Sequence, residues 1–143
     1  IDLLIRAFCQ TGVDNIVIAD PTYGMYSVSA SINDVSVVKV PLGKDFSLDP
    51  ETVLARVNSN TRIIFLCSPN NPTGNTIGKD KIRQILIGFS GIVVVDEAYI
   101  DFCPEETMVG ELTSFPNLVI LQTLSKPGAW QGCDSACASA IRS

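Results

Sequence analysis

The sequence predicts an α/β domain with a mostly parallel sheet and helices on both faces. Short apolar runs rich in β-branched residues alternate along the chain with segments of helical periodicity. One run, Ile92–Val95, consists entirely of β-branched residues, which is typical of a strand buried on both faces. Strands separated by helices indicate βαβ crossovers, and these crossovers make neighbouring strands parallel.

Each element has a local signal of its own. Residues 1–10 carry apolar side chains at helical spacing, and Gly12 is suited to stop that helix. Residues 47–57 begin with Ser-Leu-Asp-Pro-Glu, which places proline just inside a helix and glutamate in its first turn. Two more helices are predicted over residues 22–32 and 78–89, the second with lysine and arginine on its outer face. The predicted strands are residues 15–19, 35–40, 61–67, 92–95 and 117–122.

Composition limits the classes of partner. The 143 residues are 46% hydrophobic and 17% charged, with a net charge of −5, as in a globular protein. This acidic balance disfavours nucleic acid and anionic membranes, which bind basic surfaces. No apolar run approaches the roughly 18 residues of a membrane span, and residues 1–8 lack the pattern of a signal peptide.

The cysteines and the absence of histidine restrict the chemistry further. The five cysteines form no disulfide framework, so we expect reduced thiols and a cytoplasmic protein. Cys133 and Cys137 have the spacing of half a metal site, but the chain has no histidine and no second pair, so no metal is expected. Missing histidine also removes Ser-His and Cys-His hydrolase chemistry from this chain.

Polar clusters follow four of the predicted strands, at residues 20–26, 68–74, 96–99 and 123–126. Parallel strands gather such groups at the carboxyl edge of the sheet. Asp96 follows a buried strand directly, and an unpaired carboxylate there would be costly, so it needs a cationic partner. Lys126 could be that partner. A structural Asp–Lys pair in an ordinary α/β core would explain the same facts.

These clusters resemble motifs of the fold-type I pyridoxal-phosphate (PLP) enzymes and, among them, of the histidinol-phosphate aminotransferases. The motifs are PTYGMY at 21–26, SPNNPTG at 68–74, DEAYIDF at 96–102 and TLSK at 123–126. The interval of 30 residues from Asp96 to Lys126 (126 − 96) also agrees with that family. The resemblance implies that residues 1–126 are part of the large PLP-binding domain.

The resemblance also implies roles for six residues. Lys126 would be the catalytic residue, which holds PLP covalently and moves the proton between the substrate Cα and the cofactor. Asp96 would pair with the pyridine nitrogen, and Asn71 and Tyr99 would contact the phenolic oxygen. Tyr23 would stack on the ring, although a core aromatic is the simpler alternative, and Ser125 would contact the phosphate.

Other motif residues are expected to be structural. Pro72 and Gly74 would shape the turn that aims Asn71. Glu97 would be a helix-start or salt-bridge carboxylate. For Met25, Tyr26 and Trp130 we predict packing alone, and Cys67 would be a small buried hydrophobe.

The implied activity is amino transfer between histidinol phosphate and 2-oxoglutarate, giving imidazole acetol phosphate and glutamate in histidine biosynthesis. The full-length family would be a cytoplasmic homodimer. The alternatives are another fold-type I enzyme, such as a threonine-phosphate decarboxylase or an aromatic aminotransferase, and a truncated fragment without catalysis. An α/β binding domain without PLP is the remaining alternative.

The sequence departs from the family in two ways. We expect the N-terminal arm, the phosphate loop and the C-terminal small domain to be absent. After Lys126 the resemblance stops, and Asp134 stands where the family has an arginine that binds the cofactor phosphate. A carboxylate at that place would repel a phosphate.

One reading-frame change would explain the second departure. Residues 127–139 can be encoded by codons that, with a single G placed in front, translate as Ala-Trp-Gly-Leu-Ala-Gly-Met-Arg-Leu-Gly-Met-Cys-Phe. That product is the continuation expected of the family, and its arginine falls at the place of Asp134. The hypothesis is therefore that residues 127–143 form an aberrant, frameshifted tail.

Overall fold

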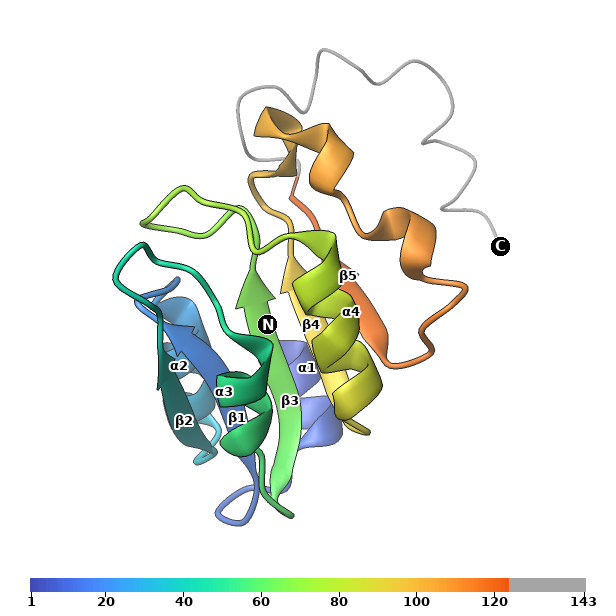
Figure 1. Cartoon of the computed structure of the whole chain (residues 1–143). Coiled ribbons are helices and arrows are strands. Elements are labelled where there is room, and N and C mark those ends of the chain that lie inside the picture. The colour runs from blue at the N-terminus through green and yellow to red at the C-terminus, as the bar shows by residue number, and fades with distance from the viewer. Residues whose placement is uncertain (124–143) are drawn as a thin grey trace.

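The computed structural model describes residues 1–123. Its centre is a five-stranded sheet in the order β2-β1-β3-β4-β5, in which every neighbouring pair is parallel (Figure 1). The strands are β1 (Asn15–Asp20), β2 (Ser36–Pro41), β3 (Thr61–Cys67), β4 (Ile92–Asp96) and β5 (Leu118–Leu121). The sequence-based prediction of a parallel α/β sheet is confirmed, and each strand agrees with its predicted range to within one residue at either end.

Helices cover both faces of the sheet, as predicted. They are α1 (Asp2–Phe8), α2 (Met25–Ile32), α3 (Pro50–Ala55) and α4 (Lys79–Gly88). In Figure 1, α3 and α4 lie on the front face of the sheet, and α1 and α2 lie behind it. Three short 3-10 turns, Ile100–Phe102, Pro104–Glu106 and Val109–Glu111, lead from β4 towards β5.

The central strands contribute to two hydrophobic cores, because successive side chains of a strand point to opposite faces. Ile64 and Leu66 of β3 pack in the core under α3 and α4. Ile63 and Phe65 of the same strand pack in the core under α1 and α2. Burial on both faces is therefore the reason that these strands are continuous apolar runs rather than alternating ones.

Helix ends differ from the predictions more than strand ends do. The side chain of Asp49 accepts hydrogen bonds from the backbone N–H groups of Glu51 and Thr52, so α3 begins with Pro50 just inside the helix, as predicted. It ends at Ala55 and not at Val57, and α2 begins at Met25 and not at Thr22. Gly12 does not stop α1, which already ends at Phe8. It lies instead in the turn before β1 with a φ of +71°, a conformation that favours glycine.

The parallel arrangement brings the carboxyl ends of β3, β4 and β5 side by side. Cys67 is the register partner of Asp96, and Asp96 is the partner of Leu121 on the other side. At the amino ends of the strands, by contrast, the buried Asp14 is paired with Arg62, with 3.1 Å between Nε and Oδ1. The site is therefore built at the carboxyl edge, where parallel sheets place their binding groups.

The described residues also bear on membrane insertion, metal binding and the state of the cysteines. Within the part of the chain that the structure describes, no helix is long and apolar enough to cross a membrane. Residues 1–123 hold no cluster of three or more His, Cys, Asp or Glu side chains suited to a metal ion, and Cys9, Cys67 and Cys103 are free thiols. Cys133 and Cys137 lie outside the described residues.

Candidate active site

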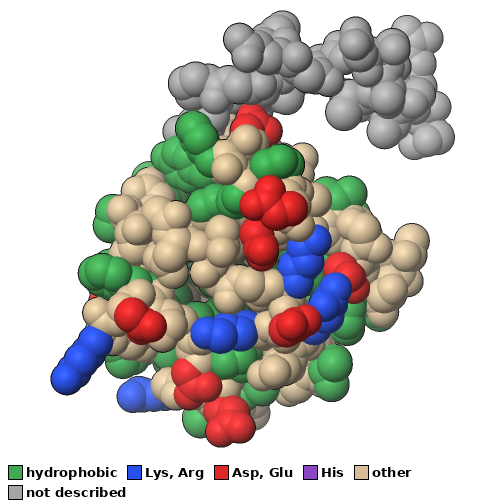
Figure 2. All heavy atoms as spheres, turned by 45° about the horizontal axis from the view of Figure 1, so that its top comes forward, with side chains coloured by type: hydrophobic (Ala, Val, Ile, Leu, Met, Phe, Trp, Pro, Cys, Tyr) green, Lys and Arg blue, Asp and Glu red, His purple; other side chains and the backbone are tan. Residues whose placement is uncertain are grey.

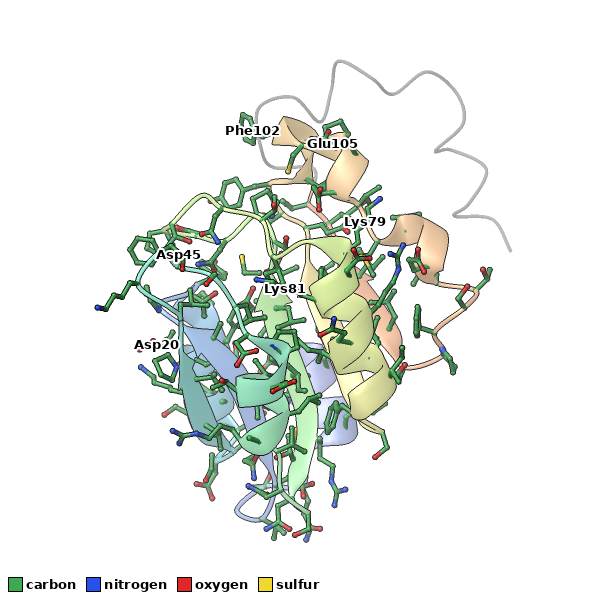
Figure 3. All side chains as sticks on the ribbon, viewed as in Figure 1. Asp20, Asp45, Lys79, Lys81, Phe102 and Glu105 are labelled. Carbon is green, nitrogen blue, oxygen red and sulfur yellow. The ribbon has the colours of Figure 1, made fainter. Side chains whose placement is uncertain are left out.

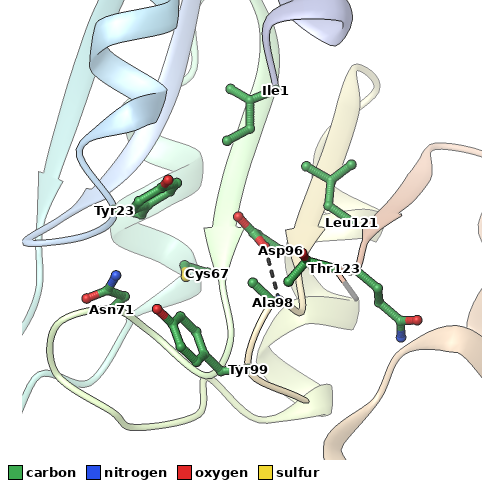
Figure 4. Close-up of a pocket in the computed structure, with 10 residues that line it drawn as sticks. Ile1, Tyr23, Cys67, Asn71, Asp96, Ala98, Tyr99, Leu121 and Thr123 are labelled. Atoms are coloured by element: carbon green, nitrogen blue, oxygen red, sulfur yellow. Dashed lines mark hydrogen bonds between the residues drawn. The ribbon is translucent and has the colours of Figure 1, made fainter. Parts of the chain in front are cut away.

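A cavity of about 320 Å³ opens at the carboxyl edge of the sheet (Figure 4). Four of the six residues predicted for the site line it together: Tyr23, Asn71, Asp96 and Tyr99. They come from the segments that follow β1 and β3 and from the end of β4, so the sheet topology alone brings them to one place. The other lining residues are Ile1, Cys67, Ala98, Leu121, Gln122 and Thr123.

Among the described residues that line the cavity, Asp96 is the one with a charged side chain, and it is buried, with only 6% of the residue exposed. The Tyr26 hydroxyl donates to its Oδ2 at 2.7 Å, and the Ala98 backbone N–H donates to its Oδ1 at 3.1 Å. None of the ion pairs found among residues 1–123 involves Asp96. Lys126, the partner that the sequence suggested, lies outside the described residues.

Tyr26 does more than pack, so the prediction of packing alone was wrong. Its ring is fully buried and stacks on Phe65 with centroids 4.9 Å apart and an interplanar angle of 17°. Burial, together with the nearby Cys67 and Asp96, raises the pKa of the Tyr26 hydroxyl, so this group is a neutral donor. No sequence rule distinguishes a tyrosine that packs from one whose hydroxyl reaches a carboxylate 70 residues away.

Tyr23 is not a core aromatic, because 39% of it is exposed and its ring lines the cavity. Its ring meets Tyr26 edge to face, with centroids 5.7 Å apart. Figure 4 shows Tyr23 and Tyr99 extending into the cavity from different segments, with Asn71 near both. The cavity thus presents the aromatic rings of Tyr23 and Tyr99, the Asn71 amide and the Asp96 carboxylate to a common space.

Asn70 and Asn71, in the turn after β3, have different roles. Asn70 is buried, and its side chain donates to Pro21 O and Thr73 Oγ1 and accepts from the Thr22 hydroxyl. These bonds hold the turn against the segment after β1. Asn71 is left to line the cavity, and Gly74 has the positive φ of +76° that the predicted turn requires.

Glu97 was expected to start a helix or form a salt bridge, and it does neither among the described residues. It is 1% exposed and accepts hydrogen bonds from Met108 N at 2.6 Å, Thr107 Oγ1 at 2.8 Å and Gln122 Nε2 at 2.9 Å. Its backbone N–H donates to Leu121 O at 2.7 Å. Glu97 therefore holds the segment of 3-10 turns (residues 100–111, called the 3-10 segment) and the end of β5 against β4.

Cys67 is the buried hydrophobe that the sequence suggested, although it also lines the cavity. Its Sγ donates to Pro69 O at 3.3 Å, and burial raises the pKa of the thiol. A protonated thiol is a weak nucleophile, so its contribution to the cavity is steric. Ser125, predicted to contact a phosphate, lies outside the described residues.

Charges of both signs interleave on the surface around this edge (Figure 2). Lys79 and Lys81 lie at the start of α4, and Glu105 and Phe102 lie on the 3-10 segment above the sheet (Figure 3). Arg83 of α4 pairs with Glu111 at 2.6 Å, which ties that segment to the helix. The predicted cationic face of α4 is thus partly neutralised by acidic neighbours.

Comparison with known proteins gives one consistent result. The model of the family "Aminotransferase class I and II" matches residues 1–141. The chain is 61% identical over 130 residues to a histidinol-phosphate aminotransferase from Cytophaga hutchinsonii and 53% identical over 130 residues to one from Parabacteroides distasonis. Each match covers 91% of this chain and 37% of the relative, so the chain spans little more than a third of these relatives.

Solved structures agree with this result. The histidinol-phosphate aminotransferase from Clostridium acetobutylicum has a TM-score of 0.77 at 28% identity, over 87% of this chain and 37% of that one. An aspartate aminotransferase from Thermus thermophilus has a TM-score of 0.80 at 22% identity, over 90% and 35%, which is a likeness of fold alone. The chain therefore belongs to the class I and II aminotransferase family and has the parallel α/β fold of the fold-type I aminotransferases.

Proposed function

We propose that the protein is a PLP-dependent aminotransferase that moves an amino group between histidinol phosphate and 2-oxoglutarate. Relatives that share up to 61% of their aligned residues with this chain bear the name of that activity. The observation that carries the proposal is the buried Asp96 carboxylate at a cavity lined by Tyr23, Asn71 and Tyr99.

The charge and the hydrogen-bonding groups of these residues fit PLP. A buried carboxylate without a cationic partner among residues 1–123 is suited to a cationic ligand, because desolvation costs several kcal/mol per ion unless a charge compensates it. The protonated pyridine ring of PLP is such a cation. Each Asp96 oxygen accepts one described hydrogen bond, and a carboxylate oxygen has capacity for another.

The other residues would orient the cofactor. Tyr23 would place its ring against the pyridine face, where offset stacking contributes about 0.5–1.5 kcal/mol. Asn71 and Tyr99 would hydrogen-bond the phenolic oxygen, and Ser125 would bind the phosphate. When bound, PLP supplies an electron sink that stabilises negative charge at the substrate Cα.

Lys126 would carry the cofactor and then act as the acid and base. The Lys126 amine would take the proton from the substrate Cα and hold it for return, and PLP would supply the group that stores the amino nitrogen between the two half-reactions. Asp96 would keep the ring nitrogen protonated throughout. In this proposal Asp96 supplies the anion for the ring nitrogen, and Tyr23 supplies the aromatic plane on which the ring stacks.

The direct test is to incubate the purified protein with PLP, histidinol phosphate and 2-oxoglutarate and to measure glutamate. We expect glutamate with the unmodified protein and with Lys44→Ala, an exposed control, and none with Lys126→Ala. Glutamate formed only from aromatic amino acids would support the aromatic aminotransferase instead. Release of carbon dioxide from threonine phosphate would support the decarboxylase, and no turnover of any substrate would support the non-catalytic fragment.

The assembly that we propose is a cytoplasmic homodimer, as the resemblance implies for the full-length family. Leu3 on α1 and Ile32 on α2 leave apolar surface exposed, which a partner could cover. Sedimentation equilibrium should give twice the chain mass. A monomer over the micromolar range would contradict this part of the proposal.

We also propose that residues 127–143 are a frameshifted tail and that residues 1–126 belong to a PLP-binding large domain. Asp134 in place of the family's arginine supports this. Sequencing the gene from the Ser125 codon onwards tests it. An extra base that restores Ala-Trp-Gly-Leu-Ala-Gly would support the frameshift, whereas an unchanged frame would refute it.

A further inference from the structure

The hydrogen bond between Tyr26 and Asp96 joins a residue of α2 to the end of β4 beneath the cavity. The donor and the acceptor are both buried, and the O···O distance of 2.7 Å is normal for a hydroxyl that donates to a carboxylate. The Ala98 backbone N–H donates to the other carboxylate oxygen, Oδ1. Tyr26 and Ala98 thus hold the two oxygens separately.

The surroundings of Tyr26 leave its ring little freedom. The ring stacks on Phe65 and meets the ring of Tyr23 in an edge-to-face contact. Because the ring is buried and packed against two other rings, its hydroxyl is held in place, and the bond therefore orients the carboxylate. A hydrogen bond to a charged group contributes about 1.5–3 kcal/mol, enough to select one orientation of Asp96.

We infer that Tyr26 is a positioning residue that orients the Asp96 carboxylate and sets how strongly it holds the ring-nitrogen proton of the cofactor. The inference rests on the proposed function, since it takes PLP as the ligand. A hydroxyl that donates to a carboxylate withdraws negative charge from it. Asp96 then competes less for the proton, which stays on the ring nitrogen.

The test uses PLP labelled with ¹⁵N in the ring, bound to the protein, because the nitrogen resonance reports protonation directly. Tyr26→Phe removes only the hydroxyl. We expect the resonance to move towards that of a neutral pyridine, and the dissociation constant of PLP to rise about ten-fold. Ile87→Ala, at an exposed position of α4, is the control and should leave the resonance at its wild-type position.

A double-mutant cycle separates positioning from packing. In an Asp96→Asn background the carboxylate is gone, so adding Tyr26→Phe should change PLP affinity less than about two-fold. Equal ten-fold losses in both backgrounds would show that the hydroxyl acts on packing and would overturn the inference. An unchanged ¹⁵N resonance in Tyr26→Phe would overturn it too.

A second substitution covers the case in which Tyr26→Phe does not fold. Difluorotyrosine at position 26 keeps the ring and makes the hydroxyl a stronger donor, so the resonance should move the other way, towards that of pyridinium. A shift in the same direction as Tyr26→Phe, or none, contradicts the inference. If the unmodified protein binds no PLP, the proposed function fails. If it binds PLP and Tyr26→Phe leaves the resonance unchanged, the inference alone fails.

Discussion

At the scale of single residues, two adjacent carboxylates at the end of β4 have opposite surroundings. Asp96 lines the cavity and is held by Tyr26 and Ala98. Glu97 turns to the other side and binds groups that follow it in the chain. This division follows from the alternation of side chains along a strand, but only the structure shows which partners each carboxylate finds.

Glu97→Ala should destabilise the protein by about 1.5–3 kcal/mol, because it removes a charged acceptor and leaves the Met108 N–H buried without its partner. Urea unfolding followed by circular dichroism measures the change. Glu105→Ala, at an exposed carboxylate of the same segment, should change stability by less than about 0.5 kcal/mol. Equal effects of the two substitutions would refute the anchoring role of Glu97.

At the scale of elements, the strands were predictable and the helix ends were less so. Strands such as β3 and β4 are continuous apolar runs because both of their faces are covered, and that pattern is visible in the sequence. The start of α3 was predictable as well, because Asp49 and Pro50 form a local helix-start signal, whereas α2 begins at Met25 and not at Thr22. The sequence therefore fixes element order better than element ends.

The residues of the site also differ in how far the sequence could predict them. Tyr23, Asn71, Asp96 and Tyr99 could be assigned to one place because each follows a strand of a parallel sheet. Tyr26 and Glu97 could not be assigned, because their partners are set by packing between distant segments. Motif position shows which segments meet, and three-dimensional contacts decide which atoms bond.

The central strand offers a test at this scale. Ile64 is fully buried in the core under α3 and α4, so Ile64→Ala should cost about 2–5 kcal/mol of unfolding free energy through lost contacts and a cavity. Ile87 on α4 is 77% exposed, so Ile87→Ala is the matched control and should cost far less. Thermal or urea unfolding of both variants would compare them, and similar losses would contradict the core assignment.

At the scale of the whole molecule, several acidic groups make stability depend on pH. The Gln10 backbone N–H and Arg62 lower the pKa of Asp14, and Arg83 lowers that of Glu111. The Ser47 and Thr52 hydroxyls lower the pKa values of Asp45 and Asp49. A carboxyl whose folded pKa lies below its unfolded value contributes stability above the unfolded value and loses it as pH falls through the folded pKa.

The free energy of unfolding should therefore be constant from about pH 7 to pH 5. It should fall below about pH 4, where the carboxyl groups of the unfolded chain take up protons. Urea midpoints measured from pH 7 to pH 2 give this profile. Asp49→Asn should flatten its acid limb. A midpoint that rises on acidification would contradict the sign of these shifts.

We propose that Asp96, Tyr23, Asn71 and Tyr99, which line one cavity, form the site of a PLP enzyme whose lysine is Lys126. The most direct measurement is to titrate the protein with PLP, reduce the complex with borohydride and map the labelled peptide by mass spectrometry. We expect saturable binding that Asp96→Ala weakens, with the label on Lys126. Label spread over exposed lysines such as Lys44, with no saturation and no effect of Asp96→Ala, would contradict it.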